Sequence, residues 1–211
     1  MALTLRRLDA AMMFSNGALK VPQENAAGRR MTPDMDEFWV FGYGSLMWNP
    51  GFDYEAREIV VATGFHRALC IRSWVHRGTQ ERPGLVLGLD RGGSCKGTAF
   101  RIAPERRAAV VAYLRERELV TNVYLERHLK VRLSDGRAVM ALGYIADRNH
   151  PQYAAGLAVE DAARIVAHAE GKSGRNLDYV ANTVAHMKEL GIRDHWMESV
   201  AARMMAIAQA A

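Results

Sequence analysis

The stretch FWVFGYGSLMWNP, residues 38–50, runs from an apolar segment into a turn with two glycines and a serine. Glycines at a strand end permit positive φ and let backbone N–H groups converge on an anion. The turn is not a dinucleotide-binding fingerprint, because Met47 occupies the position of the third glycine, and no P-loop Gly-Lys-Ser/Thr follows. Gly42 to Ser45 are therefore expected either to bind an anion or to form an ordinary turn.

A carboxyl group is expected on the apolar face of a helix that begins near Pro104. Val111, Leu114 and Glu118 have the i, i+3, i+7 spacing of one helical face, whereas residues 115–117 are expected to point to solvent. Desolvation and the negative end of the helix should both raise the pKa of Glu118. A carboxyl of this kind could act as a general acid/base. The alternative is a glutamate at a frayed helix end, in water or paired with an arginine.

Three further polar residues, Arg72, Tyr124 and Tyr144, lie in segments that otherwise read as β-strands. Tyrosines in strands usually pack against their neighbours with the hydroxyl satisfied. Tyr144 is the better functional candidate, because it follows a buried-looking Ala-Leu-Gly sequence. The alternation of apolar and polar residues places Tyr124 on the polar face of its strand.

The elements that must position these residues are predicted from hydrophobic periodicity and turn residues. Strands are expected at 37–43, 58–63, 65–72, 85–90, 94–102, 123–133 and 138–146, and helices at 104–119, 159–170, 176–190 and 193–209. Strands dominate the middle and helices the end, which indicates an α+β fold: a small, mostly antiparallel β-sheet or barrel flanked by helices. Residues 1–35 are interpreted as an N-terminal extension, a short helix plus linker, so residues 36–211 form the main domain.

Composition narrows the classes of function. The chain has 211 residues, 49% of them hydrophobic, and a formal charge of +5 that comes largely from scattered arginines. Without a basic block or an aromatic-interleaved basic stripe, no nucleic-acid partner is predicted, and the mildly positive field would favour a small anionic substrate.

Cysteine and histidine usage adds further expectations. Cys70 and Cys95 belong to no CxxC pair and are expected to be buried free thiols, which indicates a reducing cytoplasm. The histidines show no metal-ligand spacing, so no metal is predicted. No apolar run approaches the ~20 residues that span a bilayer, and no membrane association is expected. Asp9 and the shortness of the N-terminal apolar run argue against a secretory signal.

Two motifs in this order, VFGYGSLMWNP and YLRERE, resemble the ChaC family of γ-glutamylcyclotransferases, whose recognised substrate is glutathione. The resemblance extends over about residues 38–190. Supporting matches are GFHRALCIR, RPGLVLGLD, GTAFRI, YIADRNHPQY and GKSGRNLDYV.

The resemblance implies a small β-barrel with flanking helices, and cofactor-free cleavage of glutathione to 5-oxoproline and Cys-Gly. In this reaction the substrate's α-amine attacks its own γ-carbonyl. Glu118 ends the family's YLxxRE pattern and is implied to be the catalytic acid/base, whereas Glu116 is not. The implied substrate contacts are Val40, Phe41, Gly42, Tyr43, Gly44, Ser45 and Leu46, with Arg72 and Tyr144 as further candidates.

Two alternatives remain open at this point. The first is the same ring closure on other γ-glutamyl amino acids or amines. The motifs predict binding of the γ-glutamyl half of the substrate and do not indicate what binds the leaving half. The second is a non-catalytic γ-glutamyl-binding or regulatory module. The sequence does not predict the oligomeric state.

Overall fold

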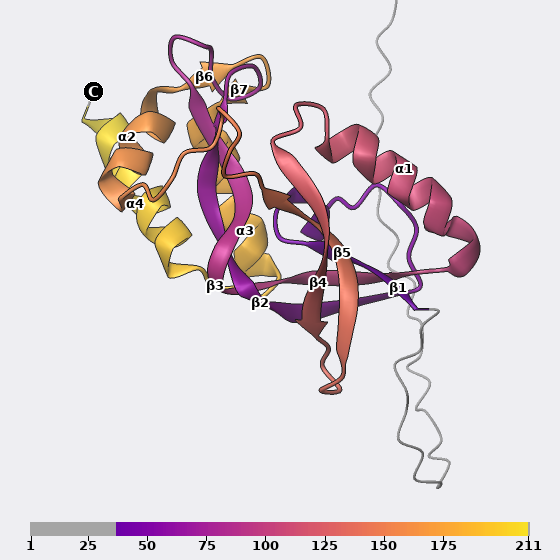
Figure 1. Cartoon of the computed structure of the whole chain (residues 1–211). Coiled ribbons are helices and arrows are strands. Elements are labelled where there is room, and N and C mark those ends of the chain that lie inside the picture. Colours follow the sequence, from indigo (N-terminus) through magenta and orange to yellow (C-terminus); the bar gives the residue numbers. More distant parts are fainter. Residues whose placement is uncertain (1–36, 211) are drawn as a thin grey trace, which may run out of the picture. The chain divides into compact units, whose positions relative to one another are not determined.

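The computed structural model describes residues 37–210, so the predicted N-terminal helix and linker lie outside the described residues. Five strands form a closed barrel in the order β1-β3-β2-β4-β5 (Figure 1). Their bounds are Phe38–Gly42 (β1), Ala56–Ser73 (β2), Gly84–Ile102 (β3), Tyr124–Arg132 (β4) and Ala138–Ala146 (β5). All neighbouring strands pair antiparallel except β1 and β5, which pair parallel. The predicted α+β barrel is confirmed.

The two longest strands, β2 and β3, form a ribbon that extends from the barrel toward the C-terminal helices (Figure 1). The predicted breaks in these strands are wrong. Gly64, Gly92 and Gly93 have φ values of 88°, 103° and 69°, and the β2–β3 register shifts between Thr63 and Phe65. Because a bulge absorbs such glycines without ending the ladder, each strand continues through its glycine-rich segment.

Helix α1 (Arg107–Glu118) follows a 3-10 turn, η2 (Pro104–Arg106), with proline at its first position. Proline suits that position because its fixed φ is helical and its missing N–H would be unpaired there anyway. Val110 and Leu114 are the buried residues of α1 and pack with Val40 of β1. One helical turn beyond Leu114, the same face presents Glu118.

Three helices form the C-terminal part: α2 (Val159–His168), α3 (Asn176–Glu189) and α4 (His195–Gln209). A two-stranded sheet of β6 (Glu170–Gly171) and β7 (Gly174–Arg175) separates α2 from α3. These bounds agree with the predicted helices to within two residues at each end. None of the helices in residues 37–210 is long and apolar enough to cross a membrane.

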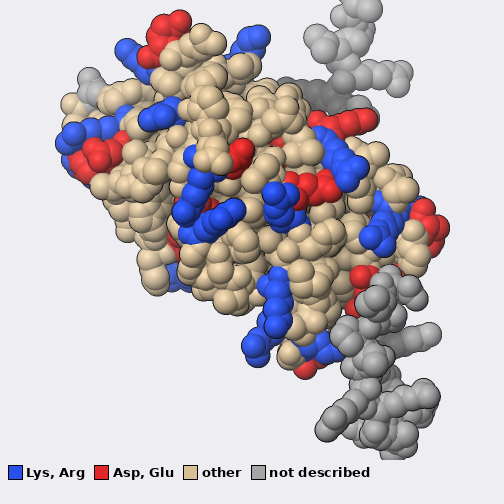
Figure 2. Space-filling model, viewed as in Figure 1, with Lys and Arg blue, Asp and Glu red and all other residues tan. Residues whose placement is uncertain are grey.

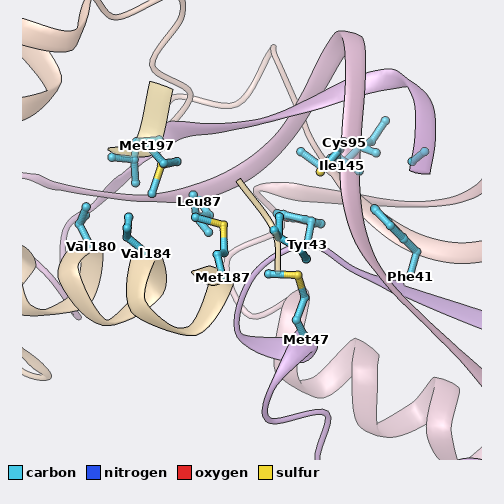
Figure 3. Close-up of a cluster of buried hydrophobic side chains, with 14 of the residues drawn as sticks. Phe41, Tyr43, Met47, Leu87, Cys95, Ile145, Val180, Val184, Met187 and Met197 are labelled. Atoms are coloured by element: carbon cyan, nitrogen blue, oxygen red, sulfur yellow. The ribbon is translucent and has the colours of Figure 1, made fainter. Parts of the chain in front are cut away.

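The main hydrophobic core joins the barrel to these helices. Side chains of α3, among them Val184 and Met187, meet Leu87 of β3 and the residues Tyr43 and Met47 that follow β1 (Figure 3). Leu46 of the turn after β1 packs in a second cluster with Val40 and Leu114, so buried side chains hold the turn on both sides. Its backbone is consequently held in one place rather than lying free on the surface.

Candidate active site

The glycine turn begins where β1 ends, at Gly42, and continues into a single 3-10 turn, η1 (Ser45–Met47). A Cβ added to Gly42 would lie 2.9 Å from the Cβ of Leu46, so glycine is required there for room. Gly44 has φ −127°, and Gly42 is not among the described glycines with positive φ. Close approach, and not the positive φ that glycine permits, therefore explains the glycine at position 42.

The turn is anchored from behind by Arg67 of β2, whose side chain is 2% exposed. Its Nε donates to the Tyr43 carbonyl at 2.6 Å, and its Nη1 donates to Asp194 at 3.0 Å. Because a trans peptide points its C=O and N–H in opposite directions, the N–H of Gly44 points away from Arg67. Within residues 37–210, the N–H groups of Gly44, Ser45 and Leu46 donate to no protein acceptor. They are available to an anion.

Glu118 and this turn line the same cavity. Its walls are Phe41, Tyr43, Gly44, Ser45, Leu46, Leu87, Glu118, Tyr124, Tyr144 and Tyr179. The Glu118 side chain is 19% exposed. Burial raises the pKa of this carboxyl, and the neighbouring Arg117 lowers it, with burial the larger effect. The direction is the predicted one, and it favours a carboxyl that exchanges its proton nearer to neutral pH than an exposed glutamate does.

Arg117 connects Glu118 to the turn. Its guanidinium donates to Ser45 Oγ and to the Asn49 carbonyl, both at 2.9 Å, and its Nε lies 3.3 Å from Glu118 Oε1. The prediction that Arg117 points to solvent is wrong, whereas Glu116 is exposed as expected. Glu118 is both paired with an arginine and inside the cavity, so the two interpretations of this residue are not exclusive.

Two tyrosines close the cavity over the peptide groups of Leu87. The hydroxyl of Tyr124 donates to the Leu87 carbonyl at 2.7 Å, and the Leu87 N–H donates to the hydroxyl of Tyr179 at 3.2 Å. The strand register leaves Leu87 without a partner on β2, and β1 pairs only with residues 98–102 of β3. The tyrosine hydroxyls therefore satisfy backbone groups that would otherwise be unpaired.

These contacts add Tyr179 to the tyrosines that could bind the substrate. Burial raises the pKa of both Tyr124 and Tyr179, which keeps them protonated. Tyr179 accepts from Leu87 and lines the cavity, so its own O–H is a candidate donor to a substrate. Sequence reasoning missed Tyr179, although it follows Asn176 by three residues on one side of a predicted helix. Asn176 satisfies both peptide groups of Leu85 in the same way.

Not all of the remaining predicted site residues line the cavity. Tyr144 lines the cavity, but its hydroxyl donates to Glu126 at 3.2 Å rather than to Glu118. Val40 is fully buried beneath α1, and Gly42 underlies the turn, so neither lines the cavity. Arg72 is exposed on β2 and also lies outside the cavity walls.

Comparison with solved structures defines the class of fold. A γ-glutamyl cyclotransferase specific to glutathione from yeast superimposes with a TM-score of 0.74 at 22% identity, covering 83% of this chain and 99% of the yeast structure. The chain therefore has the γ-glutamyl cyclotransferase fold.

Sequence comparison then gives the family. The model of the ChaC-like protein family matches residues 38–206. The glutathione-specific γ-glutamylcyclotransferase of Escherichia coli K12 is 36% identical over 169 residues, which is 80% of this chain and 73% of that protein. Glutathione-specific γ-glutamylcyclotransferase 1 of Homo sapiens is 30% identical over 174 residues, 81% of this chain and 78% of that protein. The chain belongs to the ChaC-like family.

Proposed function

We propose that this protein is a glutathione-specific γ-glutamylcyclotransferase, which converts glutathione to 5-oxoproline and cysteinylglycine. One observation carries the proposal: the Glu118 carboxyl, with its raised pKa, shares a cavity with the open N–H groups of the turn at residues 44–46. The names of the curated relatives support the same reaction and substrate.

The reaction requires little covalent participation by the protein, because the nucleophile is already part of the substrate. The α-amine of the γ-glutamyl group attacks the γ-carbonyl carbon, a new C–N bond closes the five-membered lactam, and the C–N bond to cysteine breaks. The protein's contribution is to hold the glutamyl chain in the bent conformation in which the amine and the carbonyl carbon meet, about 3–3.5 Å apart.

Proton transfer is the second requirement, and Glu118 is the group placed to perform it. At neutral pH the substrate amine is an ammonium ion and cannot attack. Glu118, as a carboxylate, removes one proton from it and later delivers a proton to the departing amine of cysteinylglycine. One carboxyl with a pKa raised by burial serves both steps, and such catalysis contributes about 10²–10⁴ in rate.

The turn supplies electrostatic stabilisation. The N–H groups of Gly44, Ser45 and Leu46 are suited to the α-carboxylate of the substrate or to the oxyanion that develops on the γ-carbonyl. The O–H of Tyr179, which lines the same cavity, is a further candidate donor. Because these donors are fixed before the substrate arrives, they need no rearrangement during the reaction.

Selectivity for the leaving half is the least constrained part of the proposal. The cavity volume of about 80 Å³ encloses only part of a tripeptide, so the cysteinylglycine half must extend toward its mouth. Arg77, whose guanidinium lies 5.3 Å from the centroid of the Tyr179 ring, is a cation suited to a terminal carboxylate. Comparing 5-oxoproline release from glutathione and from γ-glutamyl-alanine distinguishes the proposed selectivity from a broader γ-glutamyl cyclotransferase.

The decisive experiment measures 5-oxoproline and cysteinylglycine after purified protein is mixed with glutathione. Wild type should release both in equal amounts, and Glu118→Gln should lose nearly all turnover while still binding glutathione. Glu116→Gln is the matched control, because Glu116 is exposed on the same helix. More than a tenth of wild-type kcat in Glu118→Gln, or a comparable loss in Glu116→Gln, contradicts the assignment. Thermal stabilisation by glutathione without product from wild type would favour a non-catalytic binding module.

The proposed substrate is abundant in reducing compartments, and we propose the cytoplasm as the site of action. Cys70 and Cys95 are both free and buried, which is consistent with a reducing environment.

A further inference from the structure

A second cavity, of about 750 Å³, lies outside the candidate active site. Its walls come from residues 66–70 of β2, from β3 between residues 90 and 96, and from the segment after β5 between residues 148 and 157. Arg193, Asp194 and Trp196, around the start of α4, complete them. This second cavity shares no wall residue with the cavity at Glu118. Its volume is in the range of sites that hold small organic molecules, about 300–1,000 Å³.

The charge of this second cavity is positive. Its walls include four cationic side chains and two carboxylates. Each of the three arginines is already paired, Arg67 with Asp194, Arg148 with Asp90 and Arg193 with Glu198, so among the described residues the uncompensated charge is that of Lys96. Asp90 accepts hydrogen bonds from Arg148 and Tyr153, and Asp194 accepts from Arg67 and from a backbone N–H of α4. Figure 2 shows basic side chains over the middle of the β2–β3 ribbon, whose strands contribute to these walls.

Lys96 is the cation with the most remaining capacity. Its ammonium donates to the Gly191 carbonyl at 3.3 Å, and within residues 37–210 it forms no salt bridge. An ammonium has three donors, so two remain for a ligand. Lys96 is exposed at the rim, whereas Arg67 behind it is buried, paired with Asp194 and hydrogen-bonded to two backbone carbonyls. In the described part of the chain, the exposed, uncompensated charge of this cavity is therefore that of Lys96, and the charge of Arg67 is buried and paired in the wall.

The floor of the cavity is apolar. Leu69 and Cys70 of β2, Cys95 of β3 and Trp196 of α4 all contribute to the walls. Burial raises the pKa of both cysteine thiols, that of Cys70 to about 12, so both thiols are uncharged. The cysteines and Leu69 are nearly fully buried, so the apolar surface within reach of a ligand is largely that of Trp196 and Leu157, which are partly exposed. An inorganic anion would leave this apolar surface exposed to water, whereas a ligand with an apolar body would remove it from water, which is favourable.

We infer that this cavity is a binding site for a small organic anion, one that carries a carboxylate or phosphate group on an apolar or aromatic body. The anionic group pairs with Lys96 at the rim. Further donors are the N–H groups of Arg148 and Arg193 that Asp90 and Glu198 do not use. The body lies against Trp196 and Leu157, two partly exposed apolar wall residues. The walls are fixed by the ion pairs already described, so little ordering is needed on binding.

Isothermal titration with phenyl phosphate and with benzoate tests the inference and separates the two anionic groups. Benzyl alcohol serves as the neutral probe of similar shape. At least one anion should saturate a single site per chain with a Kd of about 1 mM or tighter, and benzyl alcohol should bind at least tenfold more weakly. Glutathione is absent from the titration, so the result does not depend on the proposed function.

Two lysine variants locate the binding. Lys96→Gln should weaken the binding of the anion about tenfold, as expected for loss of one charge-assisted contact. Lys130→Gln should leave it unchanged, because Lys130 is exposed on β4 and lines neither cavity. The inference is overturned if neither anion saturates, if benzyl alcohol binds as tightly, or if Lys96→Gln binds like wild type. Equal thermal midpoints of the two variants confirm that both are folded.

Discussion

The requirement for glycine at position 42 gives a prediction whose size can be worked out from the structure. In Gly42→Ala, the new Cβ would lie 2.9 Å from Leu46 Cβ and 3.3 Å from the backbone N of Met47. Carbon atoms prefer separations of about 3.5–4.0 Å, so η1 must move by roughly half an ångström or more. The obstacle includes backbone atoms, which cannot yield by a change of rotamer.

The displacement has two expected costs. Overpacking of this kind destabilises by about 1–3 kcal/mol, and each kcal/mol lowers Tm by about 2–4 °C in a chain of this size. A misplacement of about 1 Å can cost 10²-fold in rate, so a shift of half that size should lower kcat/KM for glutathione about tenfold. The free N–H groups of Ser45 and Leu46 belong to the displaced turn, which is why catalysis and stability should fall together.

Scanning calorimetry and product assays on Gly42→Ala and Gly44→Ala provide the comparison. A Cβ on Gly44 meets only the end of the Leu87 side chain, at 3.4 Å, a contact that side chain can relieve. Gly44→Ala should therefore keep the wild-type Tm and raise KM, because Gly44 lines the cavity. Wild-type Tm and kcat/KM in Gly42→Ala would refute the explanation based on room for the turn.

Three further predictions concern the cavity walls. Burial raises the pKa of Glu118 in the folded chain, so the ionised carboxylate destabilises the fold above that pKa and has no such effect below the unfolded value of 4.5. Glu118→Gln should therefore raise Tm above that of wild type at pH 8, and the difference should vanish toward pH 4.5. Calorimetry of Glu116→Gln should show no pH-dependent difference from wild type. Tyr179→Phe should raise KM and cost about 1–3 kcal/mol through the unpaired Leu87 N–H; an unchanged KM in the folded variant would remove Tyr179 from substrate binding. Arg117→Gln should move the acid limb of the kcat/KM–pH profile to higher pH, because the cation that lowers the pKa of Glu118 is gone; a profile that stays in place would show that this ion pair does not influence the base.

The sequence predicted the elements whose signals are local. Strand β5 was predicted with its observed bounds, Ala138–Ala146, because an Asp-Gly turn precedes a continuous apolar run. The starts of α2 and α3 were predicted equally well from helical periodicity. The position of Glu118 followed from its spacing to Leu114 on α1, since both the helix and its buried face are encoded within a few residues.

Other parts of the site depend on contacts that no local pattern contains. Arg67 lies in an apolar run of β2, yet its partners Tyr43 and Asp194 are 24 and 127 residues away in the sequence. Tyr179 acquires its role only because the strand register leaves Leu87 unpaired. Such residues become recognisable once the strand order is known.

The buried Arg67 behind the turn affects how the pH dependence of the catalytic rate is interpreted. A guanidinium remains charged throughout the range in which proteins stay folded, so the hold of Arg67 on the Tyr43 carbonyl does not loosen as acid or base is added. The donors of the turn consequently keep one orientation. Any titration seen in the catalytic rate then reports protons on Glu118 and on the substrate's own amine, and not a change in the shape of the turn.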